Sequence, residues 1–404
     1  MKLKGKKVLV VGLGISGKAV VRFLLKEGAS VVVSDHRLGP HTKEMFDGKD
    51  MIVVSPGVPW TIPGLREAQK KGIPIIGEFG LAAERLKVPM IAVTGTNGKS
   101  TTCTLIAKIL EQAGKKVALA GNIGKPLLEV VMEGKKLDWV VAEVSSYQLE
   151  TVGKFRPKIS ALLNITEDHL DRYDSLRDYA RAKFRIFKEQ GPRDFLIYYS
   201  EDALIRQGIR QSKARKIPFK GHGSFPRVKL VGQHNVENMM AATAVARCLK
   251  VPQPVIQRAL EKFEGLPHRT QFVQKVQGVS YYDDSKGTNV DAVVKSLAGF
   301  PDGKVLLIAG GRDKGGSYRP LRKVVSKKVK HLLLIGEAQA KMAKALLGTT
   351  SIHREGTLQK AVKTAAAKSA CGDVVLLSPA CSSFDQFQDY KERGDLFQKL
   401  VKQI

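Results

Sequence analysis

The chain has 404 residues, of which 43% are hydrophobic and 26% are charged. This length suits two or three globular domains, and no apolar run approaches the ~20 residues that a membrane-spanning helix needs. The 67 Lys and Arg residues outnumber the 38 Asp and Glu residues and give a formal net charge of +29. This charge favours polyanions such as nucleotides, but the sequence has no basic motif interleaved with aromatic residues that would indicate specific nucleic-acid binding.

The N-terminus and the cysteines indicate the cellular compartment. The lysine-rich stretch Met1–Lys7 leads straight into a predicted strand, so we expect no signal peptide. The cysteines Cys103, Cys248, Cys371 and Cys381 have neither CxxC spacing nor the density of a disulfide scaffold. We therefore expect a cytoplasmic protein with reduced thiols and no zinc site.

The first part of the chain has the pattern of a nucleotide-binding Rossmann unit. Two strands and the helix between them are predicted at Lys7–Gly12, Ala19–Leu25 and Ser30–Ser34. The turn Gly12–Gly17 matches GxGxxG, and Asp35 follows the second strand at the distance typical of an NAD site. This pattern requires only that a nucleotide can approach the backbone and that Asp35 meets a hydroxyl or an N–H group. A third strand over Met51–Val54 leads to Ser55–Pro59, which is either a ligand-binding loop or a turn stiffened by proline.

The segment Ile91–Thr102, with the sequence IAVTGTNGKSTT, predicts a phosphate-binding loop between a buried strand and a helix that begins at Lys99. Such a turn gathers backbone N–H groups and the positive end of the helix dipole at one point, which suits a polyphosphate. Lys99 adds a flexible cation, and Ser100 adds a hydroxyl that can bind Mg²⁺. Val93 stands where the GxxxxGKS/T pattern has glycine, so this is a variant P-loop. The alternative is an ordinary strand–helix turn.

Polar residues follow two buried strands near the predicted P-loop. The strand Trp139–Val144 carries Glu143 near its carboxyl end, and the strand Ile159–Ile165 is followed by Thr166–His169. A lone carboxylate at the end of an apolar strand needs a partner, which a Mg²⁺ ion on the phosphates would supply. A purely structural carboxylate is the alternative. His169 is either a hydrogen-bonded core histidine or a ligand of metal or phosphate.

Lys183 lies on the apolar face of a helix predicted over Ser175–Glu189. The apolar residues of this face are Leu176, Tyr179, Ala180 and Phe187. Basic side chains occupy the opposite face. A buried lysine is costly unless it is paired or chemically altered. Lys183 is therefore either part of the functional site or a side chain that reaches the surface along its apolar stem.

Three segments follow that carry little regular pattern. Arg206–Lys220 is strongly basic with little apolar periodicity, so we interpret it as a solvated, mobile surface in preference to the alternative, a specific nucleic-acid site. Gly232–Asn238 opens a helix, where asparagine amides either cap the helix or contact a nucleotide base. Gly265–Arg269 indicates a domain junction.

Strands and helices alternate again after this junction. Polar or glycine-rich loops follow the predicted strands Val279–Tyr282, Val305–Ala309, His331–Ile335 and Val374–Leu377. The chain is thus predicted to be an α/β protein of three domains. These are a Rossmann-like domain over 1–87, a central P-loop ATPase-like domain with a parallel or mixed sheet over 88–266, and a C-terminal Rossmann-like domain over 267–404.

A series of motifs in one order resembles the Mur ligases of peptidoglycan synthesis. The motifs are GLGISGKAVV, VVSPGVP, IAVTGTNGKSTT, GNIGKPLL, AEVSSYQLE, NITEDHLDRY, GQHNVEN, GLPHRTQ, DDSKGTN, AGGRDKGG and LLSPACSSFDQFQDYKERGDLF. The first and last resemble the D-glutamate-adding branch, and the sequence lacks the DNPR motif of diaminopimelate-adding relatives. The resemblance covers nearly the whole chain, although Ser200–Val231 is shorter and more basic than the family pattern.

The resemblance implies a ligase that uses ATP and Mg²⁺ to join D-glutamate to UDP-N-acetylmuramoyl-L-alanine through an acyl phosphate. Its partners would be these small molecules, and we expect a monomer without a specific nucleic-acid partner. The UDP-linked substrate would contact Gly14, Ile15, Ser16, Asp35, Arg37, Gly57, Asn122, Ser145, Gln148 and His169.

The resemblance also implies the ATP, metal and amino-acid sites. ATP would contact Gly95, Thr96, Asn97, Gly98, Lys99, Ser100, Thr101, Asn235, Asn238, Arg269, Asp284 and Lys286. Mg²⁺ would be bound by Ser100, Glu143, His169 and Lys183. Lys183 would be carbamylated, because a carbamate oxygen suits a hard cation that an ammonium repels. Catalysis would depend on Lys99, Glu143, His169 and Lys183. D-Glutamate would contact Thr288, Lys314, Ser383 and Phe384.

Other functions stay open at this point. Another Mur ligase is one alternative, and a folylpolyglutamate synthase-like ligase is a second that would leave the N-terminal domain without a ligand. An NAD-dependent dehydrogenase is favoured by Gly12–Gly17 and Asp35 but does not need a P-loop. A non-catalytic nucleotide-binding regulator is disfavoured because every expected ligand position is filled.

Overall fold

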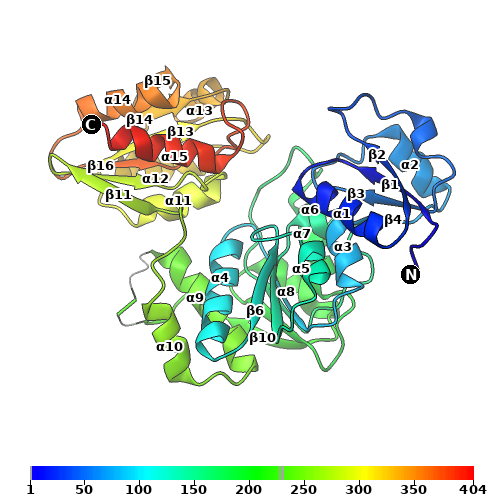
Figure 1. Ribbon diagram of the computed structural model, residues 1–404. Helices are drawn as coiled ribbons and strands as arrows, with labels where there is room; N and C mark the ends of the chain where they lie inside the picture. The colour runs from blue at the N-terminus through cyan, green and yellow to red at the C-terminus, as the bar shows by residue number, and fades with distance from the viewer. Residues whose placement is uncertain (1, 226, 229–231) are drawn as a thin grey trace. The chain divides into compact units, whose positions relative to one another are not determined.

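The computed structural model describes residues 2–225, 227–228 and 232–404 and contains three β-sheets (Figure 1). The first two sheets belong to one compact unit. The third belongs to a second unit, which also holds Thr166–Leu176 from the middle of the chain. Helices connect the parallel strands in each sheet, so the predicted α/β fold is confirmed. The domain limits at 87/88 and 266/267 stay predictions.

The N-terminal sheet is parallel, with the strand order β2-β1-β3-β4. Its strands are β1 (Lys7–Val11), β2 (Ser30–Ser34), β3 (Met51–Val54) and β4 (Ile75–Gly77). Its helices are α1 (Ile15–Lys26), α2 (Pro63–Lys70) and α3 (Glu78–Ala83), with the 3₁₀ helix η1 (Lys43–Met45). The valine-rich strands fit a sheet that helices and loops cover on both faces. Because β1 lies between β2 and β3, the loops after β1 and β3 leave the same edge, where open α/β sheets bind ligands.

The central sheet is also parallel and has the order β10-β9-β8-β5-β7-β6. Its strands are β5 (Met90–Thr94), β6 (Val117–Gly121), β7 (Trp139–Glu143), β8 (Ile159–Leu162), β9 (Phe195–Tyr199) and β10 (Arg215–Phe219). β5 is buried throughout and lies between β7 and β8. The polar segments that follow these three strands therefore begin side by side.

The helices of the central region connect its strands, except for the last two α-helices, which follow β10. They are α4 (Lys99–Gln112), α5 (Leu127–Glu133), α6 (Ser146–Glu150), α7 (Leu176–Phe184), α8 (Ala203–Gly208), α9 (Gln233–Cys248) and α10 (Gln253–Glu261), with the 3₁₀ helices η2 (Arg185–Phe187) and η3 (Ile209–Gln211). The helix predicted over Ser175–Glu189 is shorter than expected, because its last turn tightens into η2.

The basic side chains of Arg206–Lys220 are solvated, as predicted, but the segment has regular structure that its sequence pattern does not predict. The segment forms the end of α8, η3 and the edge strand β10, which pairs in parallel with β9. Ile209 and Phe219 are buried, whereas Arg215 and Lys216 are exposed. A few buried apolar side chains thus hold the segment in place. Because basic residues stand between them, the sequence shows no regular spacing of apolar residues.

The C-terminal sheet is mixed and has the order β11-β12-β16-β13-β14-β15, with β11 antiparallel to β12 and the other pairs parallel. Its strands are β11 (Gln271–Val276), β12 (Val279–Asp283), β13 (Val305–Gly310), β14 (Val329–Ile335), β15 (Ser351–Gly356) and β16 (Val374–Leu377). Its helices are α11 (Val290–Ala298), α12 (Leu321–Lys328), α13 (Gln339–Ala345), α14 (Leu358–Lys368) and α15 (Tyr390–Val401).

Alternating side chains of this sheet form two cores. Leu307 and Leu332 pack with α11, α12 and α13, whereas Leu306 and Leu333 pack with α14 and α15. This period of two, with every position apolar, is typical of a sheet covered by helices on both faces. The loops after β12, β13 and β16 leave adjacent strands at one edge.

The sequence pattern does not predict β4, β9, β10, β11 and β15. With the exception of β9, each of these lies at an edge of its sheet. Edge strands bury less surface and carry more polar residues than central strands, so their apolar pattern is weaker.

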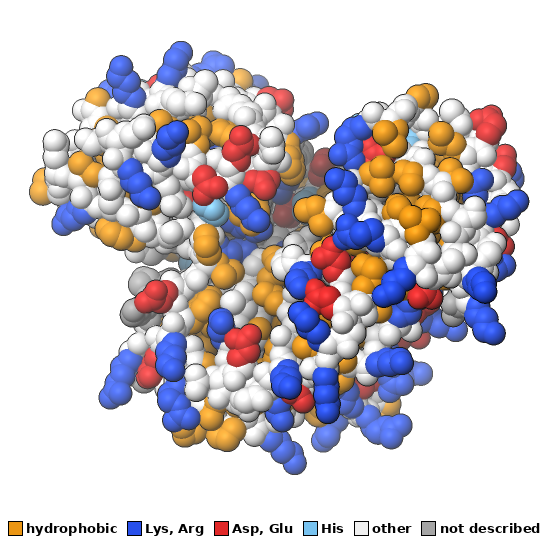
Figure 2. Space-filling model, viewed as in Figure 1, with side chains coloured by type: hydrophobic (Ala, Val, Ile, Leu, Met, Phe, Trp, Pro, Cys, Tyr) orange, Lys and Arg blue, Asp and Glu red, His pale blue; other side chains and the backbone are white. Residues whose placement is uncertain are grey.

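Basic side chains are spread over the surface. Figure 2 shows Lys and Arg on every part of the visible face, with Asp and Glu between them. In the described part of the chain, no helix has both the length and the apolar character of a membrane span.

Glu78 is a buried carboxylate where the first sheet is joined to the central one. It begins α3 directly after β4, and its side chain is 1% exposed. Leu128 N, in the first turn of α5, donates to Glu78 Oε1 at 2.7 Å. Oε2 has no hydrogen-bond partner among the described residues. Burial raises the pKa of Glu78 to about 7, because the charged form loses its hydration.

The pKa of Glu78 predicts that stability falls as the pH rises. The folded protein holds the proton more tightly than the unfolded chain, so the stabilising effect is full below pH ~4.5 and is lost as the pH passes 7. Glu78→Gln cannot ionise, and we expect it to gain up to about 3 kcal/mol relative to the wild type between pH 5 and pH 8. Thermal unfolding across this range measures the difference. Glu84→Gln, at the exposed residue that directly follows the same helix, is the control, and equal pH profiles for all three proteins would contradict the assignment.

Candidate active site

Asp35 holds the GxGxxG loop in place. Its side chain is 3% exposed, and Leu13 N donates to Asp35 Oδ2 at 2.5 Å. Arg37 Nε and Nη2 donate to the two carboxylate oxygens at 2.7 and 2.8 Å. These bonds hold the pKa of Asp35 well below its usual range, because they stabilise the charged form. The carboxylate thus meets an N–H group, one of the two partners expected from the sequence.

The remaining N-terminal candidates for contact with the UDP-linked substrate lie near the place where the backbone at Gly12 closely approaches Gly17 and Ser55. A Cβ atom at Gly17 would overlap the carbonyl oxygen of Gly12, which Ser55 Oγ bonds at 2.9 Å. The candidates Gly14, Ile15 and Gly57 are exposed, and Ser16 is half-buried. Ile15 is 78% exposed, so an apolar side chain lies open to a ligand beside this loop.

The P-loop joins β5 to α4, as predicted. Gly98 precedes the helix with φ +84°, and a Cβ atom there would overlap Asn238 Oδ1. Only glycine satisfies both constraints without strain. Lys99 Nζ donates to Gly95 O at 3.0 Å and to Thr96 O at 2.8 Å, so its cation folds over the loop. Asn238, a predicted ATP contact, therefore lies against the P-loop.

Asn164 shapes the same loop and was missed as a site residue. Thr96 N donates to Asn164 O, and Asn97 N donates to Asn164 Oδ1, both at 2.8 Å. Asn164 Nδ2 returns a bond to Asn97 O at 3.2 Å. Its position just after β8, the strand next to β5, was the available signal.

Glu143 lies beside the P-loop strand, because it pairs with Val93 in the β5–β7 register. It is 1% exposed, and Asn122 Nδ2 donates to Glu143 Oε1 at 2.6 Å. Glu143 and the buried Ser100 offer a carboxylate and a hydroxyl, the hard oxygen donors that Mg²⁺ prefers. The donor types in this part of the structure therefore fit a magnesium ion.

Ser145 and Gln148 form a capping box at the start of α6. Gln148 N donates to Ser145 Oγ at 3.2 Å, and Ser145 N donates to Gln148 Oε1 at 2.9 Å. This reciprocal pair satisfies two N–H groups of the helix start. The predicted contact of these two residues with the UDP-linked substrate stays a prediction.

Lys183 is buried, as its place on the apolar face of α7 predicted. Its side chain is 1% exposed, and Nζ donates to Gly95 O at 2.8 Å. Nζ also lies 4.3 Å from the centroid of the Tyr179 ring. The amine therefore lies at the P-loop rather than at the surface. His169, its predicted metal partner, belongs to the other compact unit, so their pairing stays a prediction.

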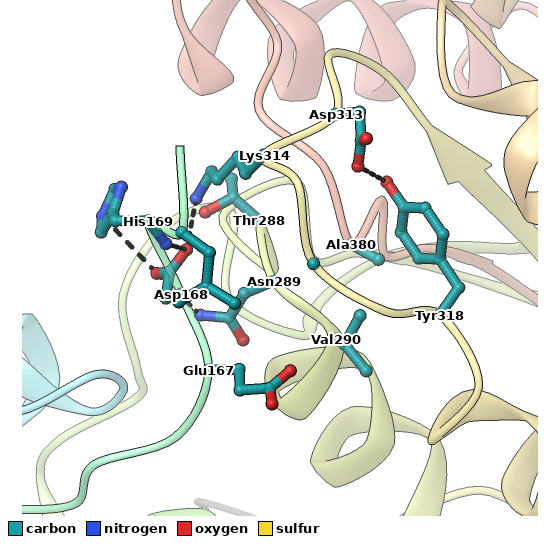
Figure 3. A pocket seen from close by; sticks show the side chains of 12 residues that line it. Glu167, Asp168, His169, Thr288, Asn289, Val290, Asp313, Lys314, Tyr318 and Ala380 are labelled. Atoms are coloured by element: carbon teal, nitrogen blue, oxygen red, sulfur yellow. Dashed lines mark hydrogen bonds and ion pairs between the residues drawn. The ribbon is translucent and has the colours of Figure 1, made fainter. Parts of the chain in front are cut away.

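The second unit has a pocket where the loops after β12, β13 and β16 meet (Figure 3). Thr288 and Lys314, two predicted D-glutamate contacts, both line it, together with His169 and Asp168. Lys314 Nζ donates to Asp168 Oδ1 at 2.9 Å, and Asn289 Nδ2 donates to Asp168 Oδ2 at 3.3 Å. Asp168 is the second functional candidate that the sequence interpretation did not assign.

Ser383 and Phe384 are not among the residues that line this pocket. Ser383 is 2% exposed, and Phe384 is 63% exposed in the loop after β16. Their predicted contact with D-glutamate stays a prediction.

The predicted ATP contacts of the second unit fall into two groups. Asn235 and Arg269 line one groove of about 740 Å³. Asp284 is buried and accepts a bond from Ser378 Oγ at 2.7 Å, and burial raises the pKa of Asp284 to about 6. Lys286 Nζ lies 3.7 Å from the centroid of the Tyr390 ring.

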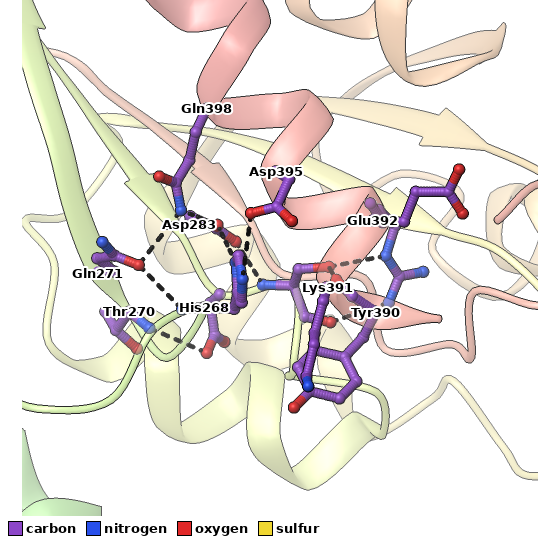
Figure 4. A network of polar contacts seen from close by, with 12 residues as sticks. His268, Thr270, Gln271, Asp283, Tyr390, Lys391, Glu392, Asp395 and Gln398 are labelled. Carbon is purple, nitrogen blue, oxygen red and sulfur yellow. Dashed lines mark hydrogen bonds and ion pairs between the residues drawn. The ribbon is translucent and has the colours of Figure 1, made fainter. Parts of the chain in front are cut away.

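A polar network fixes the loop that carries Asp284 and Lys286 (Figure 4). His268 Nδ1 lies 2.7 Å from Asp283 Oδ2, which also accepts from Gln398 Nε2 at 2.8 Å. The Asp283 carboxylate raises the pKa of His268. The buried Arg393 donates to Ser285 O at 2.9 Å and to Cys381 O at 3.2 Å, which connects the loops after β12 and β16.

Family models match the chain in three places. They are described as the MurD-like N-terminal domain of Mur ligases at residues 6–45, the Mur ligase middle domain at 93–225, and the Mur ligase glutamate ligase domain at 268–381. The chain is 46% identical over 449 aligned positions to a UDP-N-acetylmuramoylalanine–D-glutamate ligase of Geotalea daltonii, with coverage of 100% of this chain and 99% of the relative. It is 42% identical to the enzyme of the same name from Desulfatibacillum aliphaticivorans, with both chains fully covered.

Solved structures share the fold at lower sequence identity. The MurF ligase of Thermotoga maritima in complex with ADP has a TM-score of 0.66 at 17% identity, with 100% of this chain and 97% of that chain covered. UDP-N-acetylmuramate-alanine ligase MurC from the same organism has a TM-score of 0.63 at 20% identity, with 98% and 99% covered. FolC of E. coli has a TM-score of 0.62 at 18% identity, with 81% and 93% covered.

Gly98→Ala tests the geometry of the P-loop. A methyl group at φ +84° is strained and would overlap Asn238, so we expect a loss of about 2 kcal/mol or more, seen as a lower melting temperature. Gly299→Ala is the matched control, because Gly299 has φ −78° and its nearest neighbour would lie 3.5 Å from the new methyl. A Gly98→Ala protein as stable as the control would show that the loop tolerates a side chain.

Proposed function

This chain belongs to the Mur ligase family of ATP-dependent, amide-forming ligases of peptidoglycan precursor synthesis, and we propose that it adds D-glutamate to UDP-N-acetylmuramoyl-L-alanine. Full-length identity of 46% to a ligase of that name supports this branch of the family over its relatives. One structural observation carries the chemistry: Lys99, Glu143 and Lys183 all lie at the carboxyl edge of the β5 region, around the P-loop.

The N-terminal loops would bind the UDP part of the substrate. Asp35 and its bonded N–H groups hold the GxGxxG loop rigid, while the exposed Ile15 offers an apolar surface to a flat base. Arg37 adds a cation at the same edge. This assignment gives the GxGxxG motif a role in a family of ligases, where no NAD is needed.

The P-loop would bind the triphosphate of ATP. The Lys99 cation donates to carbonyls of its own loop, and we propose that it turns to the phosphates when ATP binds. α4 begins at Lys99 and points the positive end of its dipole at the same place. Ser100 and Glu143 would hold a Mg²⁺ ion, which supplies neutralising charge for the phosphate oxygens.

The proposed reaction has two steps. The carboxylate of the substrate attacks the γ-phosphate of ATP, which gives an acyl phosphate and ADP. The amine of D-glutamate then attacks the acyl carbon, and phosphate leaves from the tetrahedral intermediate. Negative charge builds up in both steps, and Lys99, Arg269 and the start of α4 would stabilise it. Since an acyl phosphate hydrolyses readily, the site must exclude water during the reaction.

D-Glutamate would bind in the pocket of the second unit. Lys314 and Thr288 supply a cation and a hydroxyl at its wall, which suits a carboxylate. We further propose a cytoplasmic monomer with domains over 1–87, 88–266 and 267–404. The nucleotide substrates support the cytoplasmic location, because ATP and UDP-linked sugars are cytoplasmic metabolites.

The proposed function is tested by ADP release from purified protein. We expect turnover with ATP, Mg²⁺, UDP-N-acetylmuramoyl-L-alanine and D-glutamate, and little with L-glutamate, L-alanine or diaminopimelate. Lys314→Ala should raise the KM for D-glutamate at least tenfold and leave the KM for ATP nearly unchanged, because Lys314 lies in the amino-acid pocket. Turnover with another amino acid in place of D-glutamate would refute the assignment to this branch.

Lys183 provides a test of the proposed carbamate. Lys183→Ala and Lys183→Arg should both lose at least a hundredfold in turnover, because neither side chain can form a carbamate. If the residue instead acts as a cation that donates to Gly95 O, Lys183→Arg should keep much of the activity. Binding of an ATP analogue, measured by calorimetry, is the control that the P-loop remains intact in both variants.

A further inference from the structure

The pocket that holds Lys314 has more acidic than basic side chains on its wall. Glu167, Asp168 and Asp313 line it, against Lys314 and His169. Carboxylates at the wall do not suit a ligand that offers only carboxylates. D-Glutamate also carries an ammonium group, and this group needs an acceptor with a negative charge.

Of the three carboxylates, that of Asp168 lines the pocket and is the one largely shielded from water. Glu167 is exposed, and Asp313 already accepts hydrogen bonds from Lys341 Nζ at 2.6 Å and from the Tyr318 hydroxyl at 2.7 Å. The Asp168 side chain is 8% exposed, and that of Lys314 is 18% exposed. Figure 3 shows Asp168 with Lys314 and Asn289 directed toward it.

The Asp168–Lys314 ion pair holds the cation that the proposed function assigns to the substrate. Lys314 Nζ lies 2.9 Å from Asp168 Oδ1. A carboxylate of D-glutamate can form an ion pair with Lys314 only if the contact between Lys314 and Asp168 breaks. Opening a largely buried pair leaves a charge without a partner, which is strongly unfavourable unless the ligand supplies a replacement.

We propose that Asp168 receives the ammonium group of D-glutamate in exchange for Lys314, which turns to a carboxylate of the same ligand. This inference rests on the proposed function. One buried pair is thereby replaced by two pairs with the ligand, so that both Asp168 and Lys314 keep a partner of opposite charge. Asn289 Nδ2 and His169 N, which donate to Asp168 at 3.3 and 3.0 Å, keep the carboxylate in place during the exchange.

If Asp168 pairs with the ligand in this way, the amine of D-glutamate contributes to binding as well as to the reaction. Glutarate has both carboxylates of D-glutamate but no amine. When glutarate binds Lys314, Asp168 loses the Lys314 cation and receives no ammonium group from the ligand, which leaves the His169 ring, 3.6 Å from Asp168 Oδ2, as its neighbouring ionisable group. The pocket should therefore bind D-glutamate more tightly than glutarate, although both ligands offer the same carboxylates to Lys314 and Thr288.

The test compares the two ligands by calorimetry, in enzyme loaded with UDP-N-acetylmuramoyl-L-alanine and a non-hydrolysable ATP analogue with Mg²⁺. We expect the wild type to bind D-glutamate at least tenfold more tightly than glutarate. Asp168→Asn should weaken D-glutamate binding at least tenfold and bring the ratio of the two dissociation constants close to one. Asp168→Glu keeps the charge and should keep the preference for D-glutamate.

Asp302→Asn is the matched control, because it makes the same carboxylate-to-amide change in a surface ion pair of the same unit and should keep the wild-type ratio. A wild type that binds glutarate as tightly as D-glutamate overturns the inference. This comparison uses the wild type alone, so it tests the inference even if Asp168→Asn does not fold. An unchanged ratio in a folded Asp168→Asn protein overturns it as well. Failure of the proposed function is distinct, because the wild type would then release no ADP with D-glutamate.

Discussion

Parallel strands place the ends of neighbouring strands at one edge of a sheet, and the GxGxxG loop, the P-loop and the pocket that holds Lys314 all lie at such edges. The loops after β1 and β3, after β5, β7 and β8, and after β12, β13 and β16 each leave adjacent strands. The strand interiors are apolar and buried, so polar residues collect in these loops. At the P-loop, the start of a helix adds the positive end of its dipole. The arrangement of sheets thus determines where phosphate and carboxylate groups can bind before any single side chain is considered.

Buried charges at these edges are each held by partners. Asp35 accepts bonds from Leu13 and Arg37, Glu143 accepts from Asn122, and Lys183 donates to Gly95. An isolated charge in such positions would be strongly unfavourable, so these partners stabilise and orient the groups. The same holds for Arg393, which donates to backbone carbonyls of two loops rather than to a carboxylate. Its burial lowers the pKa of Arg393 to about 10, and the cation acts as a brace between loops that carry predicted ligand contacts.

The GxGxxG loop shows that a short motif is weaker evidence for function than the structure around it. Alone it favours an NAD-dependent dehydrogenase, and the acidic residue at the end of β2 fits that interpretation. In the structure Asp35 is saturated by protein N–H groups, so the carboxylate serves the loop itself. The family of the chain accounts for the rest, because the MurD-like N-terminal domain model matches the segment with this loop and the Mur ligase middle domain model matches the segment with the P-loop.

With the exception of β9, the inner strands of the sheets were predictable from the sequence, as were the P-loop and the burial of Lys183, because they depend on local apolar patterns and on short motifs with one physical solution. Edge strands such as β10 and β11 were not, since they bury little surface and their sequence carries little apolar period. Pairings between distant segments were also beyond the sequence: Asn164 with the P-loop, Asp168 with Lys314, and Arg393 with the loops after β12 and β16. Residue type and spacing show that a polar group needs a partner, but the partner is chosen by which strand ends the tertiary fold brings side by side.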